Sequence, residues 1–128
     1  MAGIPDSHPR KKSLESRQKI VDGNSMGVLA DSAMIAHGRG EAFDYLLGEK
    51  TTESARAAIR ESATRLRNAR RPVISVNGNT VVLAGDGAIR LAAVLGCPIE
   101  VNIYYRTPSR VKGLISLLEE WRFNVSQE

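Results

Sequence analysis

Apolar side chains recur at helical spacing through the first 70 residues of the chain. The pattern predicts three helices there: one from a cap at Ser7 or His8, with Pro9 in its first turn, to Gly23 or Gly27, a short one over residues 41–47, and one from about Thr52 to Ala69. Gly48 is predicted to end the short helix. The first half of the chain is therefore expected to be helical.

The hydrophobic period changes after residue 71, where short β-branched runs alternate with helical stretches. This part predicts a strand over residues 72–76, a helix from Asp86 to Gly96, a strand over residues 99–105, and a helix that starts at Thr107. Right-handed crossovers make the two strands of this βαβα unit parallel. The predicted fold class is α/β, with ligands at the carboxyl ends of the strands.

The chain has 128 residues, of which 42% are apolar, and this length suits a single core. One domain over residues 1–128 is predicted, made of a helical segment over 1–70 and the βαβα unit over 71–128. The first residues lack a signal-peptide pattern and no apolar run approaches membrane-spanning length, so a cytoplasmic protein is expected. Cys97 is the only cysteine, which excludes an intrachain disulfide and favours a small buried side chain.

The net charge of +4 comes from one segment, because residues 51–71 carry six basic and two acidic side chains. Its arginines lie on the outer face of the predicted helix, opposite an apolar stripe. A solvated helix face is the favoured interpretation. A basic nucleic-acid-binding module is the weaker alternative, because the sequence shows no set of aromatic stacking residues and no recognised fold signature.

The run from His37 to Glu41 places a histidine and an arginine among glycines, just before the predicted short helix. Gly38 and Gly40 can adopt sharp turns that expose N–H groups, and Arg39 adds a guanidinium. This stretch predicts an anion site in a loop at a helix start. The alternative is a glycine-rich loop whose Arg39 forms a salt bridge with Glu41 or Glu49.

Two arginines share one face of the first predicted helix with Leu14 and Val21. Arg17, in mid-helix, either meets an anionic partner on the buried side or extends its guanidinium into water. For Arg10, close to the helix end, the edge position is favoured.

Polar residues follow both predicted strands. The run Asn77-Gly78-Asn79 follows the first strand, and Tyr105-Arg106-Thr107 follows the second, so one crevice could collect two amides and a guanidinium. Turn chemistry is the alternative explanation of Asn77 and Asn79. The chain has neither a GxGxxG fingerprint nor a Walker loop. The residues alone thus indicate an anion-binding α/β domain.

Four segments resemble the archaeal phosphopantothenate synthetase family, the 4-phosphopantoate:β-alanine ligases. They are residues 4–10 with Ser13, Leu14 and Arg17 downstream, residues 35–46, residues 72–79, and residues 105–107. The resemblance implies an ATP-dependent condensation of 4-phosphopantoate with β-alanine through an acyl adenylate, on the archaeal route to coenzyme A. It also implies a Rossmann-like fold, of which this chain is the first half of a larger sheet, a homodimer, and Mg²⁺ bound with ATP.

The resemblance also implies roles for individual residues. Arg17 and Arg39 match positions that contact ATP in the family, and His37 and Arg39 are expected to be catalytic. His37 is further expected to bind phosphate or orient the acyl phosphate. The residues expected to hold phosphopantoate are Asn77, Asn79 and Arg106. No residue of the chain is expected to ligate a metal.

Family members continue beyond the equivalent of Glu128 for a segment of comparable size, which supplies further strands and much of the ATP site. Two interpretations follow. The chain is a fragment of a longer ligase, or it is a shortened relative that binds a phosphoester or ATP without catalysis.

Overall fold

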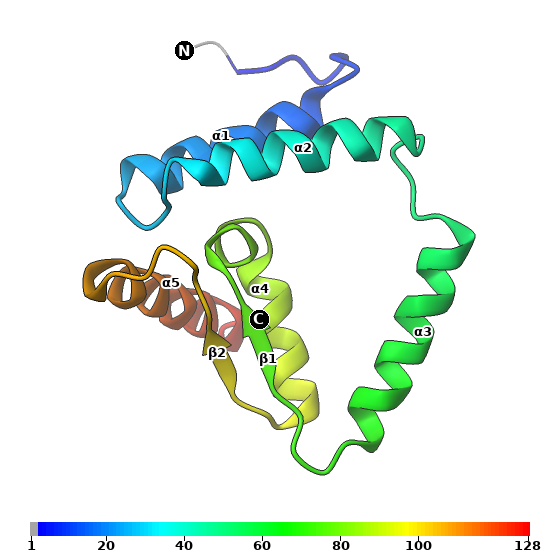
Figure 1. Ribbon diagram of the computed structural model, residues 1–128, viewed down its shortest axis with the longest axis vertical. Coiled ribbons are helices and arrows are strands. Elements are labelled where there is room, and N and C mark those ends of the chain that lie inside the picture. Colours follow the sequence, from blue (N-terminus) through cyan, green and yellow to red (C-terminus); the bar gives the residue numbers. More distant parts are fainter. Residues whose placement is uncertain (1–2) are drawn as a thin grey trace.

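The computed structural model describes residues 3–128. Its elements in chain order are α1 (Lys11–Ser25), α2 (Ser32–Leu46), α3 (Glu53–Asn68), β1 (Ile74–Val76), α4 (Gly78–Leu95), β2 (Ile99–Val101) and α5 (Pro108–Ser126). Helices α1 and α2 lie side by side, while α4 and α5 pack with the two strands into a second layer (Figure 1). This order confirms the predicted α/β fold with N-terminal helices.

The two strands are parallel, as predicted, and α4 forms the crossover between them. The register pairs Ile74 with Ile99 and Val76 with Val101. Both strands are shorter than the apolar runs that predicted them, because a strand extends only as far as its neighbour pairs with it. Tyr104 and Tyr105, at the end of the second run, lie beyond the paired region and are exposed.

Several helix ends agree with the prediction. Thr52 caps α3 by accepting a hydrogen bond from the backbone N–H of Ala55 at 3.3 Å, and Thr107 caps α5 in the same way. Gly96 ends α4 with a φ of 60°. At Gly48, φ is 84° just after the end of α2.

Helix α1 begins at Lys11, so the predicted cap at Ser7 or His8 is wrong. The backbone N–H of Arg10 donates to His8 Nδ1 at 3.1 Å, and the N–H of Lys11 donates to the carbonyl of His8 at 3.0 Å. These bonds close a turn around Pro9 before the helix starts. The helix ends at Ser25, inside the predicted range, and Gly27 follows it with a φ of 75°.

Helix α4 begins eight residues before the predicted cap at Asp86. Asn77 is its N-cap, and its Oδ1 accepts hydrogen bonds from the backbone N–H and the hydroxyl of Thr80, both at 2.9 Å. Ala84, with φ of −143° and ψ of 30°, marks a kink inside the helix. The run Asn77-Gly78-Asn79 is therefore a helix start, so the alternative explanation of Asn77 and Asn79 as turn residues is wrong.

The same helix contradicts the expectation that no apolar run approaches membrane-spanning length. Its 18 residues are long and apolar enough to cross a bilayer, judged by length and composition alone. In this structure α4 contacts α1, α2, α5 and both strands. These contacts are those of a central core helix, and the window contains two charged residues, Asp86 and Arg90.

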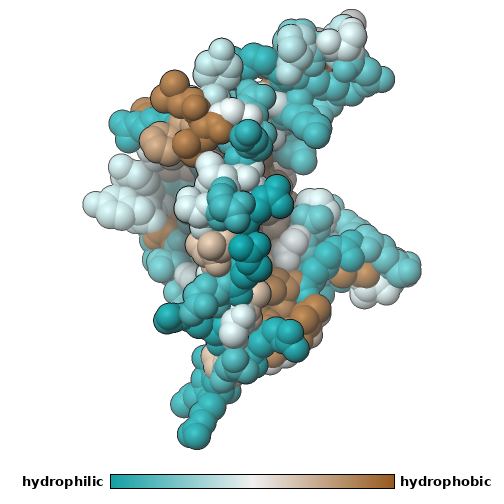
Figure 2. Space-filling view, turned by 90° about the vertical axis from the view of Figure 1, so that its right-hand side faces the viewer, coloured by the Kyte–Doolittle hydropathy of each residue, from teal (hydrophilic) through white to brown (hydrophobic). Residues whose placement is uncertain are grey.

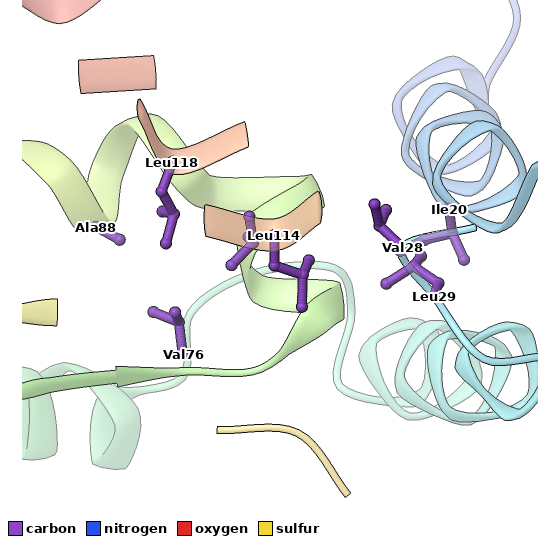
Figure 3. Close-up of a cluster of buried hydrophobic side chains, with 8 residues drawn as sticks. Ile20, Val28, Leu29, Val76, Ala88, Leu114 and Leu118 are labelled. Carbon is purple, nitrogen blue, oxygen red and sulfur yellow. The ribbon is translucent and has the colours of Figure 1, made fainter. Parts of the chain in front are cut away.

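The core lies between α4, α5 and β1 and continues into the connection between α1 and α2 (Figure 3). Ile20, Val81 and Leu114 have no exposed surface. Val28 and Leu29, in the connection, reach into the same cluster and tie the helical pair to the βαβα unit. Cys97 is half-buried directly before β2, so it is less buried than predicted.

Helix α3 stands apart from the other elements (Figure 1). It contains no buried residue, and Ile59, on its apolar stripe, is 61% exposed. The face of the molecule on the α3 side is mostly hydrophilic, with hydrophobic groups in separate patches (Figure 2). The arginines of α3 therefore lie on a solvated face, as the favoured interpretation predicted.

Candidate functional site

The run from His37 to Gly40 lies in the middle of α2, so the predicted loop at a helix start is wrong. The residues before it, from Ser32 to Ala36, continue the helix, and Gly38 and Gly40 are absent from the positions with positive φ. Glycine weakens a helix by about 1 kcal/mol without forbidding it, and packing of α2 against α1 compensates. No helix N-terminus is available to bind an anion at this point.

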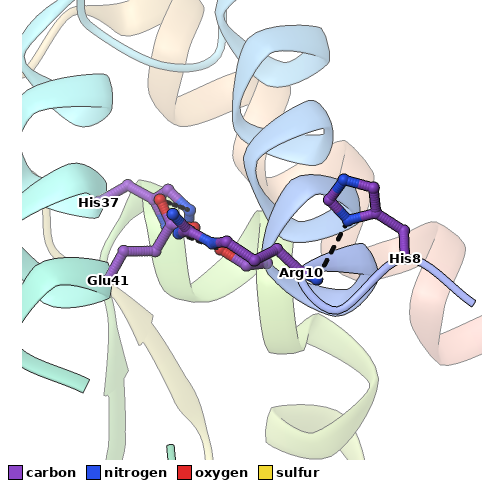
Figure 4. A network of polar contacts seen from close by, with 5 residues as sticks. His8, Arg10, His37 and Glu41 are labelled. Atoms are coloured by element: carbon purple, nitrogen blue, oxygen red, sulfur yellow. Dashed lines mark hydrogen bonds and ion pairs between the residues drawn. The ribbon is translucent and has the colours of Figure 1, made fainter. Parts of the chain in front are cut away.

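Glu41 lies between a guanidinium and an imidazole that come from different parts of the chain. Its Oε1 is 3.5 Å from an Arg10 guanidinium nitrogen, and its Oε2 is 3.9 Å from Nε2 of His37 (Figure 4). The same Arg10 nitrogen donates to the hydroxyl of Ser13 at 3.1 Å. This network joins the turn before α1 to the middle of α2.

A cavity of ≈ 690 Å³ opens beside this network, between the turn before α1 and α2. His8, Arg10 and Lys12 line one wall, and His37, Gly40 and Glu41 line the other. Asp6 accepts a hydrogen bond from Lys11, and this bond raises the pKa of the Lys11 ammonium. Two segments that are distant in the sequence thus form one polar cavity, which we call the α1–α2 cavity.

The two ring nitrogens of His37 lie in different surroundings. Nε2 is fully buried and has no hydrogen-bond partner in residues 3–128, since the carboxylate of Glu41 is too far away at 3.9 Å. Nδ1 makes no hydrogen bond within the same residues and is not among the buried unpaired atoms, so it remains open to solvent. His37 therefore presents one free nitrogen to the cavity that it lines.

Arg39 and Arg17 are exposed and lie outside this cavity. Within the described part of the chain Arg39 has no ion-pair partner, so the predicted salt bridge to Glu41 or Glu49 is wrong. Arg17 extends into solvent, which agrees with the second of its two interpretations. The side chain of Arg10 is 53% exposed, which agrees with the favoured edge position, but it also meets an anionic partner, Glu41, which was the other interpretation.

A second cavity of ≈ 220 Å³ lies at the carboxyl ends of the strands and contains Asn77, Asn79 and Tyr105. This arrangement agrees with the predicted crevice for the two amides. Arg106 does not line it, and its guanidinium instead donates to the carbonyl of Val101 at 3.4 Å. Arg110 takes the expected place of a guanidinium in the cavity wall.

Arg110 is a residue that the sequence interpretation missed. Its guanidinium donates to the carbonyl of Tyr105 at 2.8 Å, which fixes it across the start of α5. The signal in the sequence was its place in the first turn after the Thr107 cap. Asn79 also has a structural partner, because its amide donates to the carbonyl of Ala33 at 3.2 Å and joins α4 to α2.

No group of three or more histidine, cysteine, aspartate or glutamate side chains within residues 3–128 could hold a metal ion. Mg²⁺ is usually held by phosphates and one or two carboxylates, so such a cluster is not required for a metal that arrives with a nucleotide. The described residues thus offer cations and amides to an anionic ligand.

Comparison with known proteins identifies relatives over nearly the whole chain. A family model described as phosphopantothenate/pantothenate synthetase matches residues 54–126. Proteins named 4-phosphopantoate–β-alanine ligase from Thermococcus onnurineus and Methanospirillum hungatei are 47% and 49% identical, over 94% and 91% of this chain. The chain covers 46% and 48% of those proteins, so it spans about half the length of the relatives that it matches.

Proposed function

Because the chain belongs to the phosphopantothenate/pantothenate synthetase family, we propose that it forms part of an ATP-dependent ligase that condenses 4-phosphopantoate with β-alanine. The products are 4'-phosphopantothenate, AMP and pyrophosphate, formed through an acyl adenylate. The observation that carries the proposal is the identity of nearly half of all matched residues to proteins with that ligase name.

The reaction brings several negative charges together, because a carboxylate must approach a triphosphate before the acyl group can pass to an amine. Fixed cations and N–H donors reduce this repulsion and stabilise the charge that develops in the transition state. Arg39 and Arg17 suit this task, since both are permanently charged and neither has an ion-pair partner within residues 3–128.

The antiparallel pairing of α1 and α2 supports a shared role for these two arginines. Arg17 lies eight residues before the end of α1 at Ser25, and Arg39 lies seven residues after the start of α2 at Ser32. At a rise of about 1.5 Å per residue, the two stand at similar distances from the connection between the helices. We propose that both contact the phosphates of ATP, and that Mg²⁺ arrives with those phosphates.

The proposed substrate contacts divide between the two cavities. In the α1–α2 cavity, His37 binds a phosphate group or orients the acyl phosphate. Arg39, which lies outside this cavity, is the second proposed catalytic residue. At the strand ends, Asn77 and Asn79 hold phosphopantoate. Arg106 has the same proposed role, and the carbonyl bond to Val101 that it makes here must open for it to reach a ligand.

We further propose that the protein is cytoplasmic and acts as a homodimer. The separate position of α3, which contains no buried residue, supports a larger assembly.

Pyrophosphate release tests the proposal. The protein is expected to release pyrophosphate only when ATP, 4-phosphopantoate and β-alanine are all present, and the Arg39→Ala variant is expected to lose this activity. Arg56→Gln, on the solvated face of α3, removes the same charge and serves as the control with unchanged activity. An intact protein that binds phosphopantoate or ATP but forms no product would instead support a non-catalytic binding module.

A further inference from the structure

We infer that the α1–α2 cavity is a binding site for the phosphate group of a phosphorylated substrate, in which Arg10 and His37 contact the phosphate and Glu41 positions both. The identity of the phosphorylated substrate rests on the proposed function. The site itself rests on the contacts of these three side chains.

The carboxylate of Glu41 lies beside one ring nitrogen of His37. Its buried Nε2 faces Glu41, and its open Nδ1 is free to donate into the cavity. A buried polar atom that lacks a partner costs about 1–3 kcal/mol. A shift of the Glu41 carboxylate by about 1 Å would bring this contact within hydrogen-bond distance. Glu41 would then fix the orientation of the ring.

Arg10 is held by the same carboxylate from the other side of the cavity. Its contact with Glu41 is long, at 3.5 Å, and its side chain remains half-exposed, so several of its five N–H donors are free. A guanidinium with free donors can bind a phosphate in a bidentate manner. Glu41 therefore places two phosphate donors, from separate segments, around one space.

The first turn of α1 adds Lys12 to a lining in which Arg10 and Lys11 are the other permanent cations and Asp6, Glu41, Asp44 and Glu49 are the carboxylates. Lys12 and Ser13, in the first turn of α1, line the cavity, and α1 has no side-chain cap. Lys12 has no ion-pair partner within residues 3–128. Three acidic residues besides Glu41 line the cavity. Asp6 forms an ion pair with Lys11. Asp44 lies near the C-terminal end of α2, and Glu49 lies beyond it.

Gly40 provides access on the α2 side. It lines the cavity, and a Cβ added there would meet no atom within 4 Å, so packing does not require a glycine. A glycine in a helix interior costs about 1 kcal/mol relative to alanine. A bare helix surface next to Glu41 and His37 lets a ligand approach the helix backbone closely, which accounts for this residue type.

The experiment is a titration of the 128-residue chain with inorganic phosphate, followed through the ¹⁵N shifts of the His37 ring. We expect saturable shifts of Nδ1, and affinity about tenfold weaker in Glu41→Gln and in Arg10→Gln, as loss of a charged hydrogen bond implies. Glu41→Gln should also change the tautomer signal of His37. Arg56→Gln is the control with the same charge change as Arg10→Gln, and circular dichroism establishes that each variant is folded.

The Glu41→Gln variant distinguishes a role of Glu41 in positioning the phosphate donors from a purely electrostatic effect of its charge. Removal of a negative charge strengthens anion binding if only the Coulomb field matters, whereas loss of positioning weakens it. Stronger or unchanged phosphate binding in Glu41→Gln, or an equal loss in Arg56→Gln, overturns the inference. Acetate at the same concentrations should compete poorly with phosphate. If acetate bound as well as phosphate does, the cavity would be a general carboxylate site instead. Phosphate binding without ligase turnover would contradict the proposed function and leave this site standing.

Discussion

At the scale of the residue, a substitution of Gly40 should change the stability of the fold and the binding of phosphate in opposite directions. We expect Gly40→Ala to raise the free energy of unfolding by up to about 1 kcal/mol, because alanine favours the helix and the added methyl meets no atom within 4 Å. Denaturant unfolding measures this change. The same variant should bind phosphate more weakly, because the methyl group enters the α1–α2 cavity.

Gly38→Ala is the matched control for this prediction. Gly38 also lies inside α2 and has open space around its Cβ position, but it does not line the cavity. It should therefore show the gain in stability with unchanged phosphate binding. A Gly40→Ala variant that is stabilised and still binds phosphate normally would show that the glycine has no role in access.

Asn77 is the second residue whose structural and functional roles can be separated. Asn77→Ala should lower the free energy of unfolding by about 1 kcal/mol, because the start of α4 loses the cap formed by Oδ1 with Thr80. Asn77→Asp keeps a capping oxygen and should restore most of this stability, as thermal unfolding can measure. If Asn77 also contacts phosphopantoate, Asn77→Asp should bind this anion more weakly in spite of its restored fold.

At the scale of the element, the packing of α4 on α5 depends on one glycine. A Cβ at Gly85 would lie 2.5 Å from Cδ1 and 2.6 Å from Nε1 of Trp121. Gly85→Ala must therefore displace the indole ring or part the two helices, and we expect a loss of about 1–3 kcal/mol in unfolding free energy. Urea unfolding monitored by Trp121 fluorescence measures the loss directly.

Gly87, two residues further along α4, provides the comparison. An added Cβ there would meet no atom within 4 Å, so Gly87→Ala should stabilise the protein by up to about 1 kcal/mol. Opposite signs for the two alanine variants would show that close packing, and not helix propensity, governs the loss at Gly85. Equal effects would contradict the contact with Trp121.

The sequence predicted those elements whose ends are set by neighbouring side chains. Thr107 caps the helix that it was expected to cap, α3 begins next to the expected Thr52, and Gly96 ends α4, because each interaction involves residues at most four positions apart. The cap of α4 at Asn77 is equally local, but the sequence interpretation placed it at Asp86. The prediction failed at α2. There the glycines suggested a loop, and only the packing against α1, which is a long-range contact, explains why the helix continues through Gly38 and Gly40.

At the scale of the whole molecule, the same limit applies to the candidate site. The strand-end residues Asn77, Asn79 and Tyr105 could be brought together from the sequence because parallel strands meet at one edge. The contact of Arg10 with Glu41 could not, because 31 positions separate them and the antiparallel pairing of two helices has no local signature. Arg17 and Arg39 remain predictions, since they lie on the surface outside both cavities.

Helix α3 gives a prediction for the molecule as a whole. A helix of 16 residues with no buried side chain has little tertiary stabilisation, and isolated helices of this length are only marginally stable in water. Amide hydrogen exchange should therefore be fastest within α3 and slowest in α4, which contacts α1, α2, α5 and both strands. Protection of α3 that equals that of α4 would contradict this expectation and show that α3 is covered in solution. A rise of that protection with protein concentration would identify the cover as a second copy of the chain, because only association depends on concentration.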